Sequence, residues 1–296
     1  MISDNKLMNV RGGNMLKGLS TAGLGDVSSL SELVTLASEN NFDAVETTSE
    51  QLKTFISDVG IQGAKKFLKE KDILLGAVSL PVEWRKDDVA FNKGIFELVE
   101  CAEVASELGC KTFFTYFMPS TDQEVIPYFM KLSKRLRLLG RLLAQYDMEL
   151  ALEYVGPHHL RNKWQNQFIW NAKNTVNWVD FIGEENIGIV LDSFHWHTSE
   201  ETIDTILSLE VHKVKYAHIN DARNIPVHEV LDNDRVYPGE GIIDLENFLK
   251  AINTINYHGL ITQEVLTIEQ PTNSSEVLAE RSAQAFQHVF HKAGLI

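Results

Sequence analysis

Short β-forming runs alternate with long amphipathic stretches along nearly the whole chain, and this alternation is the feature that most limits its fold. Eight runs carry the apolar, β-branched and aromatic residues that are typical of strands. They cover residues 15–20, 43–48, 73–80, 111–117, 148–153, 187–192, 213–219 and 259–265. Helical periodicity follows Ser29 and recurs at about 90–108, 123–146, 171–182, 200–209, 245–255 and 275–293.

The number of repeats favours a closed barrel over an open sheet. Strands that alternate with helices indicate a parallel sheet covered by helices, and eight such units close into a (β/α)8 barrel. Within the 296 residues, no segment rich in Pro, Gly or Ser and no change of composition marks a linker. We therefore expect residues 1–296 to form a single α/β domain, a (β/α)8 TIM barrel, with residues 1–14 as an N-terminal extension. An open doubly wound sheet is the alternative.

The charge balance of the chain argues against a nucleic-acid partner. The 41 acidic and 27 basic residues give a formal net charge of −14, whereas affinity for nucleic acids comes mostly from Lys and Arg side chains that neutralise phosphates. The N-terminal stretch MISDNKLMNVRGG has no apolar h-region, and no apolar run approaches the ~18 residues of a membrane span. We expect a cytoplasmic protein without a membrane partner, in which Cys101 and Cys110 stay reduced.

Four successive strands end at residue types that bind metal ions. The fifth to eighth candidate strands end at Glu153, at Asp192, near His218 and at Glu264. In a (β/α)8 barrel these strand ends meet at the C-terminal mouth, where barrel enzymes carry their active sites. A single acidic residue at a strand end more often pairs with Lys or Arg, but four such residues in succession predict a shared site.

The alternation of side chains along each strand predicts that these residues point into the barrel. On the sixth strand, Asp192 shares a face with Gly188 and Val190, while larger aliphatic residues occupy the other face. On the fifth strand, Ala151 and Glu153 share one face in the same way. The large apolar residues therefore face the helices, and the polar strand ends face the interior.

Three carboxylates that converge in a partly dry site repel one another unless a positive charge compensates them. A divalent cation supplies that charge, with Glu153, Asp192, His218 and Glu264 as its ligands. Three oxygen donors and one imidazole suit Mn²⁺, Mg²⁺ or Co²⁺, and they also accommodate Zn²⁺. The sequence therefore predicts a divalent metal ion as the cofactor and leaves these four metals open.

Five motifs of the chain resemble the xylose-isomerase-like barrel superfamily, in particular its branch of sugar epimerases, inosose-processing enzymes and hydroxypyruvate isomerases. The motifs are LEYVG (152–156), VLDSFHWH (190–197), AHINDAR (217–223), RVYPGEGIIDL (235–245) and ITQEV (261–265). The segments FDAVE (42–46) and ASELGCKTFFT (105–115) are similar to the second and fourth strands of the family. The resemblance thus covers nearly the whole chain.

The resemblance implies a role for each polar residue of these motifs. The metal ligands of the family correspond here to Glu153, Asp192, His218 and Glu264. The resemblance also implies that Glu153 and Glu264 lie on opposite sides of the bound substrate and exchange its proton. His195 and Arg223 would contact substrate oxygens.

We therefore expect a divalent-metal-dependent isomerase, epimerase or dehydratase of a small polyhydroxy carbonyl compound, a ketose or an inosose. A metal ion next to a carbonyl makes the adjacent C–H more acidic, and a carboxylate then removes the proton to give a metal-stabilised enediolate. All three reactions share this intermediate, so the product stays open. Long loops at 157–170 and 224–241 would overhang the mouth and influence the choice of sugar or cyclitol. The sequence also leaves open whether the chain forms a homo-oligomer.

Three other functions are alternatives on the same barrel. In a zinc DNA-repair enzyme similar to AP endonucleases we expect a histidine at the end of the third strand, but GAVSLPVEW (76–84) has none. A non-catalytic sugar-binding barrel would not need two opposed carboxylates. A Schiff-base aldolase would need an inward lysine, whereas Lys213 and Lys215 alternate out of phase with His218.

Overall fold

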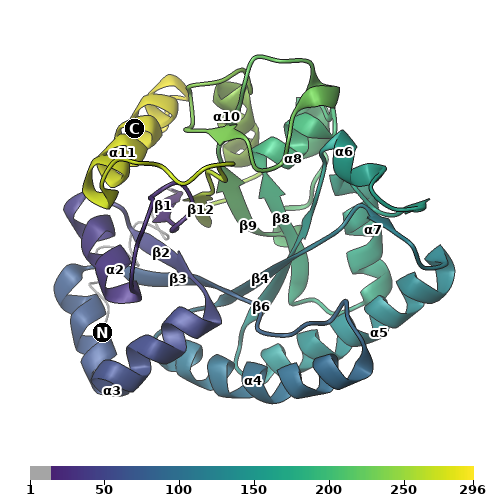
Figure 1. The fold of residues 1–296 in the computed structure, drawn as a ribbon, viewed down its shortest axis with the longest axis horizontal. Coiled ribbons are helices and arrows are strands. Elements are labelled where there is room, and N and C mark those ends of the chain that lie inside the picture. Colours follow the sequence, from purple (N-terminus) through teal and green to yellow (C-terminus); the bar gives the residue numbers. More distant parts are fainter. Residues whose placement is uncertain (1–14) are drawn as a thin grey trace.

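The structure of residues 15–296, a computed structural model, is a closed barrel of parallel strands with helices around it (Figure 1). The barrel strands are β1 (Leu16–Leu19), β2 (Ala44–Thr47), β3 (Leu74–Ser79), β4 (Thr112–Phe117), β6 (Glu149–Tyr154), β8 (Ile187–Asp192), β9 (Val214–Ile219) and β12 (Leu260–Gln263). Around the ring they follow the order β1-β12-β9-β8-β6-β4-β3-β2, and β1 also pairs with β2. The expected TIM barrel is confirmed and the open sheet is excluded. The N-terminal extension expected at residues 1–14 lies outside the described residues.

Helices surround the barrel, and three of them were not expected from the sequence. They are α2 (Leu30–Glu39), α3 (Ser49–Lys71), α4 (Asp88–Glu107), α5 (Val125–Ala144), α6 (His158–Arg161), α7 (Ala172–Ile182), α8 (Ser193–Thr198), α9 (Ile203–Leu207), α10 (Leu245–Thr254) and α11 (Ser275–Lys292). The unexpected helices are α3 and the short helices α6 and α8. Helix α3 is kinked at Gly60, where φ is 68°. The kink interrupts the apolar period by which a helix is recognised. The helix expected at 200–209 is also shorter, because the chain turns at Glu200 with φ 56° before α9 begins.

The barrel is held together by an interior layer and an outer layer of apolar side chains. The interior cluster consists of Ala77, Ala151, Val190 and Tyr216. A much larger core fills the space between the strands and the helices. The inward positions of Ala151 and Val190 confirm the alternation expected for β6 and β8. None of the helices between residues 15 and 296 combines the length and the apolarity that a bilayer crossing demands.

The two lysines near the start of β9 form ion pairs with acidic residues outside the strand-end cluster. Lys213 ends the short helix η1 (Val211–Lys213) and pairs with Asp180 of α7. Lys215 pairs with Glu149 of β6, with 2.8 Å between Nζ and Oε1. A Cβ atom on Gly188 would lie 2.5 Å from Lys215 Cγ, and Glu149 shares its face of β6 with Ala151 and Glu153. Lys215 therefore lies on the inner face near the start of the strands, and the expectation that it faces the helices was wrong, because the strand register is irregular at this point.

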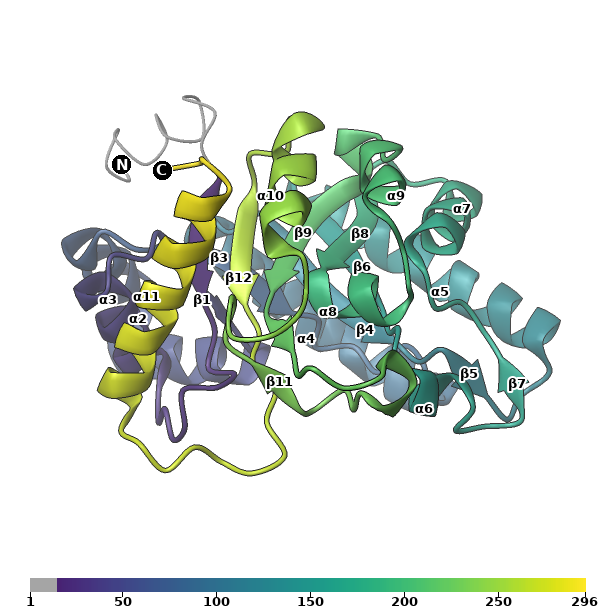
Figure 2. The same ribbon diagram turned by 90° about the horizontal axis from the view of Figure 1, so that it is seen from above.

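Short elements in the loops cover one end of the barrel. Strand β5 (Ser120–Thr121) pairs with β7 (Asn166–Gln167), and β10 (Asp221–Ala222) pairs with β11 (Arg235–Val236). A further short helix, η2 (Val227–Glu229), lies between β10 and β11. Figure 2 shows β5, β7, β11 and α6 gathered at the end of the barrel opposite the C-terminus of the chain. The two loops expected to overhang the mouth thus contain secondary structure of their own.

Candidate metal centre

The residues at the ends of β6, β8, β9 and β12 converge on one point. Glu153, Asp192, His218 and Glu264 each offer one ligand atom, and these atoms lie within 4.8 Å of one another. The Nδ1 atom of His218 is 2.7 Å from Glu153 Oε1 and 3.7 Å from Glu264 Oε2. It is 3.9 Å from Asp192 Oδ2. The structure brings the four expected ligands together, and their role as ligands stays a prediction.

The register of the barrel strands explains this convergence. In β8 and β9, Asp192 and His218 are Cα partners, and His218 is in turn the partner of Thr262 in β12. In β6, Glu153 is the partner of Val190, which precedes Asp192 on the same face of β8. Partners in adjacent strands point to the same side of a sheet, so the polar strand ends meet inside the barrel. Asp192 and His218 are fully buried there.

A buried guanidinium, which the sequence reasoning missed, joins this cluster. Arg235 of β11 donates to Asp192 Oδ2 at 3.0 Å and to Glu264 Oε2 at 2.7 Å. Its other terminal nitrogen donates to Asp232 Oδ1 at 3.0 Å. Only 1% of the Arg235 side chain is exposed. The sequence signal was the motif RVYPGEGIIDL, which begins with this arginine.

The hairpin that carries Arg235 is fixed by the buried carboxylate of Asp221. Asp221 accepts hydrogen bonds from the backbone amides of Ala222, Gly239, Gly241 and Ile243, at 2.8 to 3.0 Å. A Cβ atom on Gly241 would lie 2.1 Å from the carbonyl oxygen of Ala222, so no larger residue fits in this loop. Ala222 is in turn the strand partner of Arg235. Asp221 therefore holds the loop whose first residues deliver the guanidinium.

His195 lies beside the cluster because Asp192 caps the helix that contains it. The Oδ1 atom of Asp192 accepts from the backbone amides of Phe194 and His195 at the start of α8. His195 is 2% exposed, and its Nδ1 accepts from the backbone amide of Gly156 at 3.3 Å. Its Nε2 lies 3.5 Å from the Arg235 guanidinium. The expected substrate-contacting histidine is thus adjacent to the four ligand candidates.

The structure does not bring Arg223 to the cluster. The Arg223 side chain is 55% exposed, and its Nε donates to Asp234 at 2.8 Å. Arg235 is the arginine that reaches the strand ends. The expected contact between Arg223 and substrate oxygens stays a prediction without a described partner in the site.

The electrostatics of the cluster favour the protonated form of His218. Burial alone would lower the pKa of His218, but the negative charges of Glu264, Glu153 and Glu46 outweigh it and raise the pKa well above its usual value. Burial likewise raises the pKa of Glu264, to about 8. In the absence of a metal ion, protons therefore supply part of the missing positive charge.

The pKa of Asp192 moves in the opposite direction. Burial would raise it, but the charges of Arg235, His195 and His218 lower the pKa of Asp192 to about 2. For Arg235, burial would lower the pKa, but Asp192 and Glu264 raise it. Asp192 and Arg235 thus stay ionised as a buried pair at neutral pH.

Negative groups outnumber the fixed positive ones around the strand ends. The carboxylates in hydrogen-bond contact with His218 or Arg235 belong to Glu46, Glu153, Asp192, Asp232 and Glu264. Within the described part of the chain, the guanidinium of Arg235 and the imidazoles of His218 and His195 face them. Since uncompensated buried charge is costly, this donor set fits a divalent cation.

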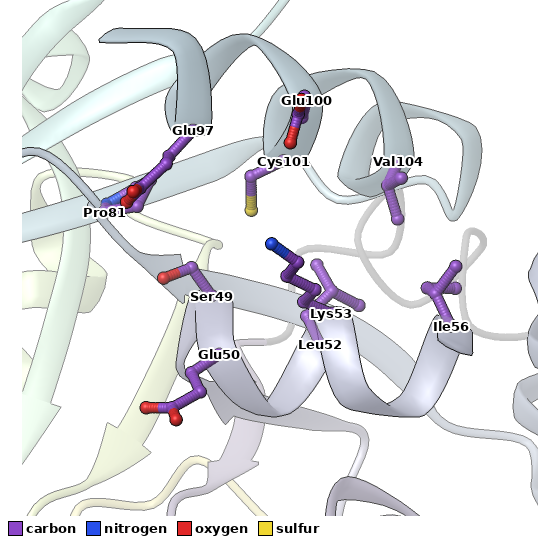
Figure 3. A pocket seen from close by; sticks show the side chains of 10 residues that line it. All are labelled: Ser49, Glu50, Leu52, Lys53, Ile56, Pro81, Glu97, Glu100, Cys101 and Val104. Atoms are coloured by element: carbon purple, nitrogen blue, oxygen red, sulfur yellow. The ribbon is translucent and has the colours of Figure 1, made fainter. Parts of the chain in front are cut away.

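A separate groove lies between α3 and α4, with side chains of both helices along it (Figure 3). Lys53 extends across it toward Cys101, and neither residue belongs to the strand-end cluster. Burial raises the pKa of the Cys101 thiol to about 12, so this thiol is protonated at neutral pH. Cys101 and Cys110 are both free, as expected.

The fold and the cluster define a (β/α)8 barrel with a carboxylate and histidine centre at the carboxyl ends of its strands. A family model described as xylose isomerase-like TIM barrel matches residues 34–287. The chain belongs to this family, which confirms the resemblance of its motifs.

Known proteins resemble the chain over nearly its whole length. An inosose isomerase of Bacillus velezensis is 24% identical over 271 residues, which cover 90% of this chain and 93% of that protein. A xylose isomerase domain protein from Alicyclobacillus acidocaldarius subsp. acidocaldarius has a TM-score of 0.88 and 28% identity, over 95% of this chain and 99% of its own. IOLI protein, solved with a bound zinc atom, has a TM-score of 0.80 and 23% identity, over 94% of this chain and 99% of its own. Ketose 3-epimerases and inosose dehydratases are also among the relatives.

Proposed function

We propose that the chain is a divalent-metal-dependent isomerase or epimerase of a small polyhydroxy carbonyl compound, with an inosose or a ketose as the substrate. The observation that carries this proposal is the convergence of three carboxylates and one imidazole at the carboxyl ends of four barrel strands. The relatives support it, because they include an inosose isomerase and ketose 3-epimerases.

In this proposal Glu153, Asp192, His218 and Glu264 hold the ion. A bound divalent ion polarises the carbonyl oxygen and the adjacent hydroxyl oxygen of a substrate. It thereby makes the C–H of the carbon next to the carbonyl more acidic. The zinc atom in IOLI protein supports a divalent metal in this family. The mixed set of oxygen and nitrogen donors suits Mn²⁺, Co²⁺, Zn²⁺ or Mg²⁺.

The protein groups around the ion have two further roles, proton transfer and orientation of the substrate. Glu153 and Glu264 exchange the substrate proton, since both carboxylates reach the same point from different strands. His195 and Arg235 orient substrate oxygens, because both are buried next to these carboxylates and carry N–H groups. In this assignment Arg235 takes the role that the family resemblance gave to Arg223. Return of the proton to the same carbon from the opposite face epimerises that carbon, and return to the adjacent carbon isomerises the sugar.

Proton exchange with solvent tests this proposal directly. The protein, loaded with each of the four metals, is incubated in D2O with a panel of inososes and ketoses, and the products are read by NMR and mass spectrometry. We expect deuterium to enter a carbon next to the carbonyl of at least one compound. Sugar binding without exchange would indicate a non-catalytic binder, and cleavage of abasic DNA would indicate a repair enzyme. Either outcome refutes the proposal.

Substitution of one carboxylate separates catalysis from binding. We expect Glu264→Gln to lower exchange by at least about 10²-fold, because a positioned general base contributes 10²–10⁴-fold, while much of the substrate affinity remains. The matched control is Glu269→Gln, an exposed carboxylate five residues further along the chain. Turnover of Glu264→Gln at the rate of this control would remove Glu264 from the mechanism.

A further inference from the structure

The imidazole of His218 has a second buried carboxylate on its other side. Glu46 of β2 lies with its Oε2 atom 2.7 Å from Nε2 of His218, whereas Nδ1 faces Glu153 at 2.7 Å. Glu46 is 8% exposed. The two ring nitrogens therefore have separate partners, one within the ligand cluster and one outside it.

A short network of hydroxyl groups holds Glu46 in this position. The hydroxyl of Tyr216 is 2.6 Å from Glu46 Oε2 and also 2.6 Å from the hydroxyl of Thr262. The tyrosine donates to the carboxylate, and the threonine hydroxyl can donate to the tyrosine oxygen. The rings of Phe114 and Tyr216 pack edge-on against His218, with centroids 5.6 Å and 4.9 Å away. Both the carboxylate and the imidazole are therefore fixed.

A local irregularity in the barrel places Glu46 at the level of this network. The strand register shifts between Val45 and Glu46, so that Glu46 is the partner of Ala77 and Gly76 is bypassed. A Cβ atom on Gly76 would lie 2.3 Å from the side chain of Leu260. Leu260 thus occupies the space beside Gly76, and the bulge sets the level at which the Glu46 carboxylate enters the interior.

We propose that Glu46 is a positioning residue of the metal centre: its carboxylate accepts a hydrogen bond from the Nε2–H group of His218 and thereby leaves the lone pair of Nδ1 free to bind the ion. This inference rests on the proposed function. A histidine ligand needs one nitrogen with a free lone pair, and a carboxylate on the other nitrogen fixes both the tautomer and the orientation of the ring. Loss of such a partner typically weakens metal binding by about 10–100-fold. Glu46 acts through His218 and does not itself touch the ion.

Metal affinity measured by calorimetry with each ion alone tests this role without reference to activity. Glu46→Gln keeps the size of the side chain and removes the carboxylate. We expect about 10–100-fold weaker binding of Zn²⁺ and Co²⁺. The loss for Mg²⁺ should be smaller, because Mg²⁺ depends least on a nitrogen ligand. Equal losses for all ions would mean that Glu46 acts only through its charge, and they would overturn the inference.

The matched control is Glu201→Gln, which changes a half-buried carboxylate that also accepts from a tyrosine. Glu201 bonds the hydroxyl of Tyr154 at 2.9 Å and lies outside the ligand cluster. This variant should bind all four ions as the wild type does. Wild-type protein that binds none of them would refute the proposed function itself. Metal binding by the wild type and equal binding by Glu46→Gln would refute only the role of Glu46.

A double-mutant cycle shows whether the effect passes through the histidine. In a His218→Gln background, Glu46→Gln should cause no further loss of affinity for Zn²⁺. If Glu46→Gln lowered the affinity for Zn²⁺ as much in this background as it does in the wild type, the inference would be overturned. If Glu46→Gln fails to fold, Tyr216→Phe provides the same test, because it removes the hydroxyl that holds the carboxylate. We then expect a severalfold loss that is again larger for Zn²⁺ than for Mg²⁺, and unchanged affinities would contradict it.

Discussion

Replacement of Arg235 by Met tests whether its guanidinium balances the charge of the strand ends. Removing one member of a buried ion pair costs about 3–5 kcal/mol, because the partner charge is left unpaired. The partners of Arg235 are Asp192, Glu264 and Asp232. Burial already raises the pKa of Glu264 to about 8, so this group can stay neutral. The pKa of Asp192, about 2 in the wild type, rises when Arg235 is removed, but His195 and His218 still lower it and favour the charged form. We therefore expect a loss near the lower limit, about 3 kcal/mol.

The assay is urea unfolding at pH 7, in EDTA and again with excess Mn²⁺. With Mn²⁺ bound, the difference in unfolding free energy between the wild type and Arg235→Met should be smaller, since the ion replaces the missing positive charge. The control is Arg223→Met, whose ion pair with Asp234 has a similar length of 2.8 Å but is 55% exposed on the arginine side. Exposed pairs contribute about 0–1 kcal/mol. Equal losses for the two variants, or a loss below about 1 kcal/mol for Arg235→Met, would refute the reasoning.

Two further predictions follow from the same cluster. The metal-free protein should lose stability as the pH rises from 6.5 to 8.5, because the folded state raises the pKa of both His218 and Glu264 and thus binds more protons than the unfolded chain. Thermal unfolding in EDTA should show this slope, and the same slope with saturating metal would contradict it. His195→Asn should raise the KM for the substrate, because His195 is proposed to orient substrate oxygens. Its metal affinity should change less than about twofold, because His195 is outside the ligand set. A large loss of metal affinity in calorimetry would contradict that role.

The convergence of the cluster follows from two regularities that a sequence displays directly. Side chains alternate along a strand with a period of two, and parallel strands of a barrel end at the same rim. Asp192 and Glu153 could therefore be assigned to the interior from the small residues that share their faces, Val190 and Ala151. The barrel itself followed from the number of strand and helix repeats.

The residues that the sequence reasoning missed depend on features without a local period. Arg235 reaches the cluster on a hairpin that is folded by hydrogen bonds to Asp221, and no local pattern shows where such a loop returns. Glu46 enters the interior at a bulge, which shifts the level of its strand partner. Helix α3 was missed because Gly60 interrupts its apolar period. For Arg235 and Glu46, contacts between distant segments decided the structure, whereas the kink of α3 is a local feature of the backbone at Gly60.

Because Arg235 comes from a hairpin and not from a barrel strand, the candidate metal centre consists of two parts that different elements of the fold hold in place. The four candidate ligands lie at the ends of barrel strands. The guanidinium of Arg235 lies on a hairpin that is held by hydrogen bonds to the carboxylate of Asp221. Substitutions between residues 224 and 234 can therefore alter the position of Arg235 while the strand ends that carry the four candidate ligands keep their geometry.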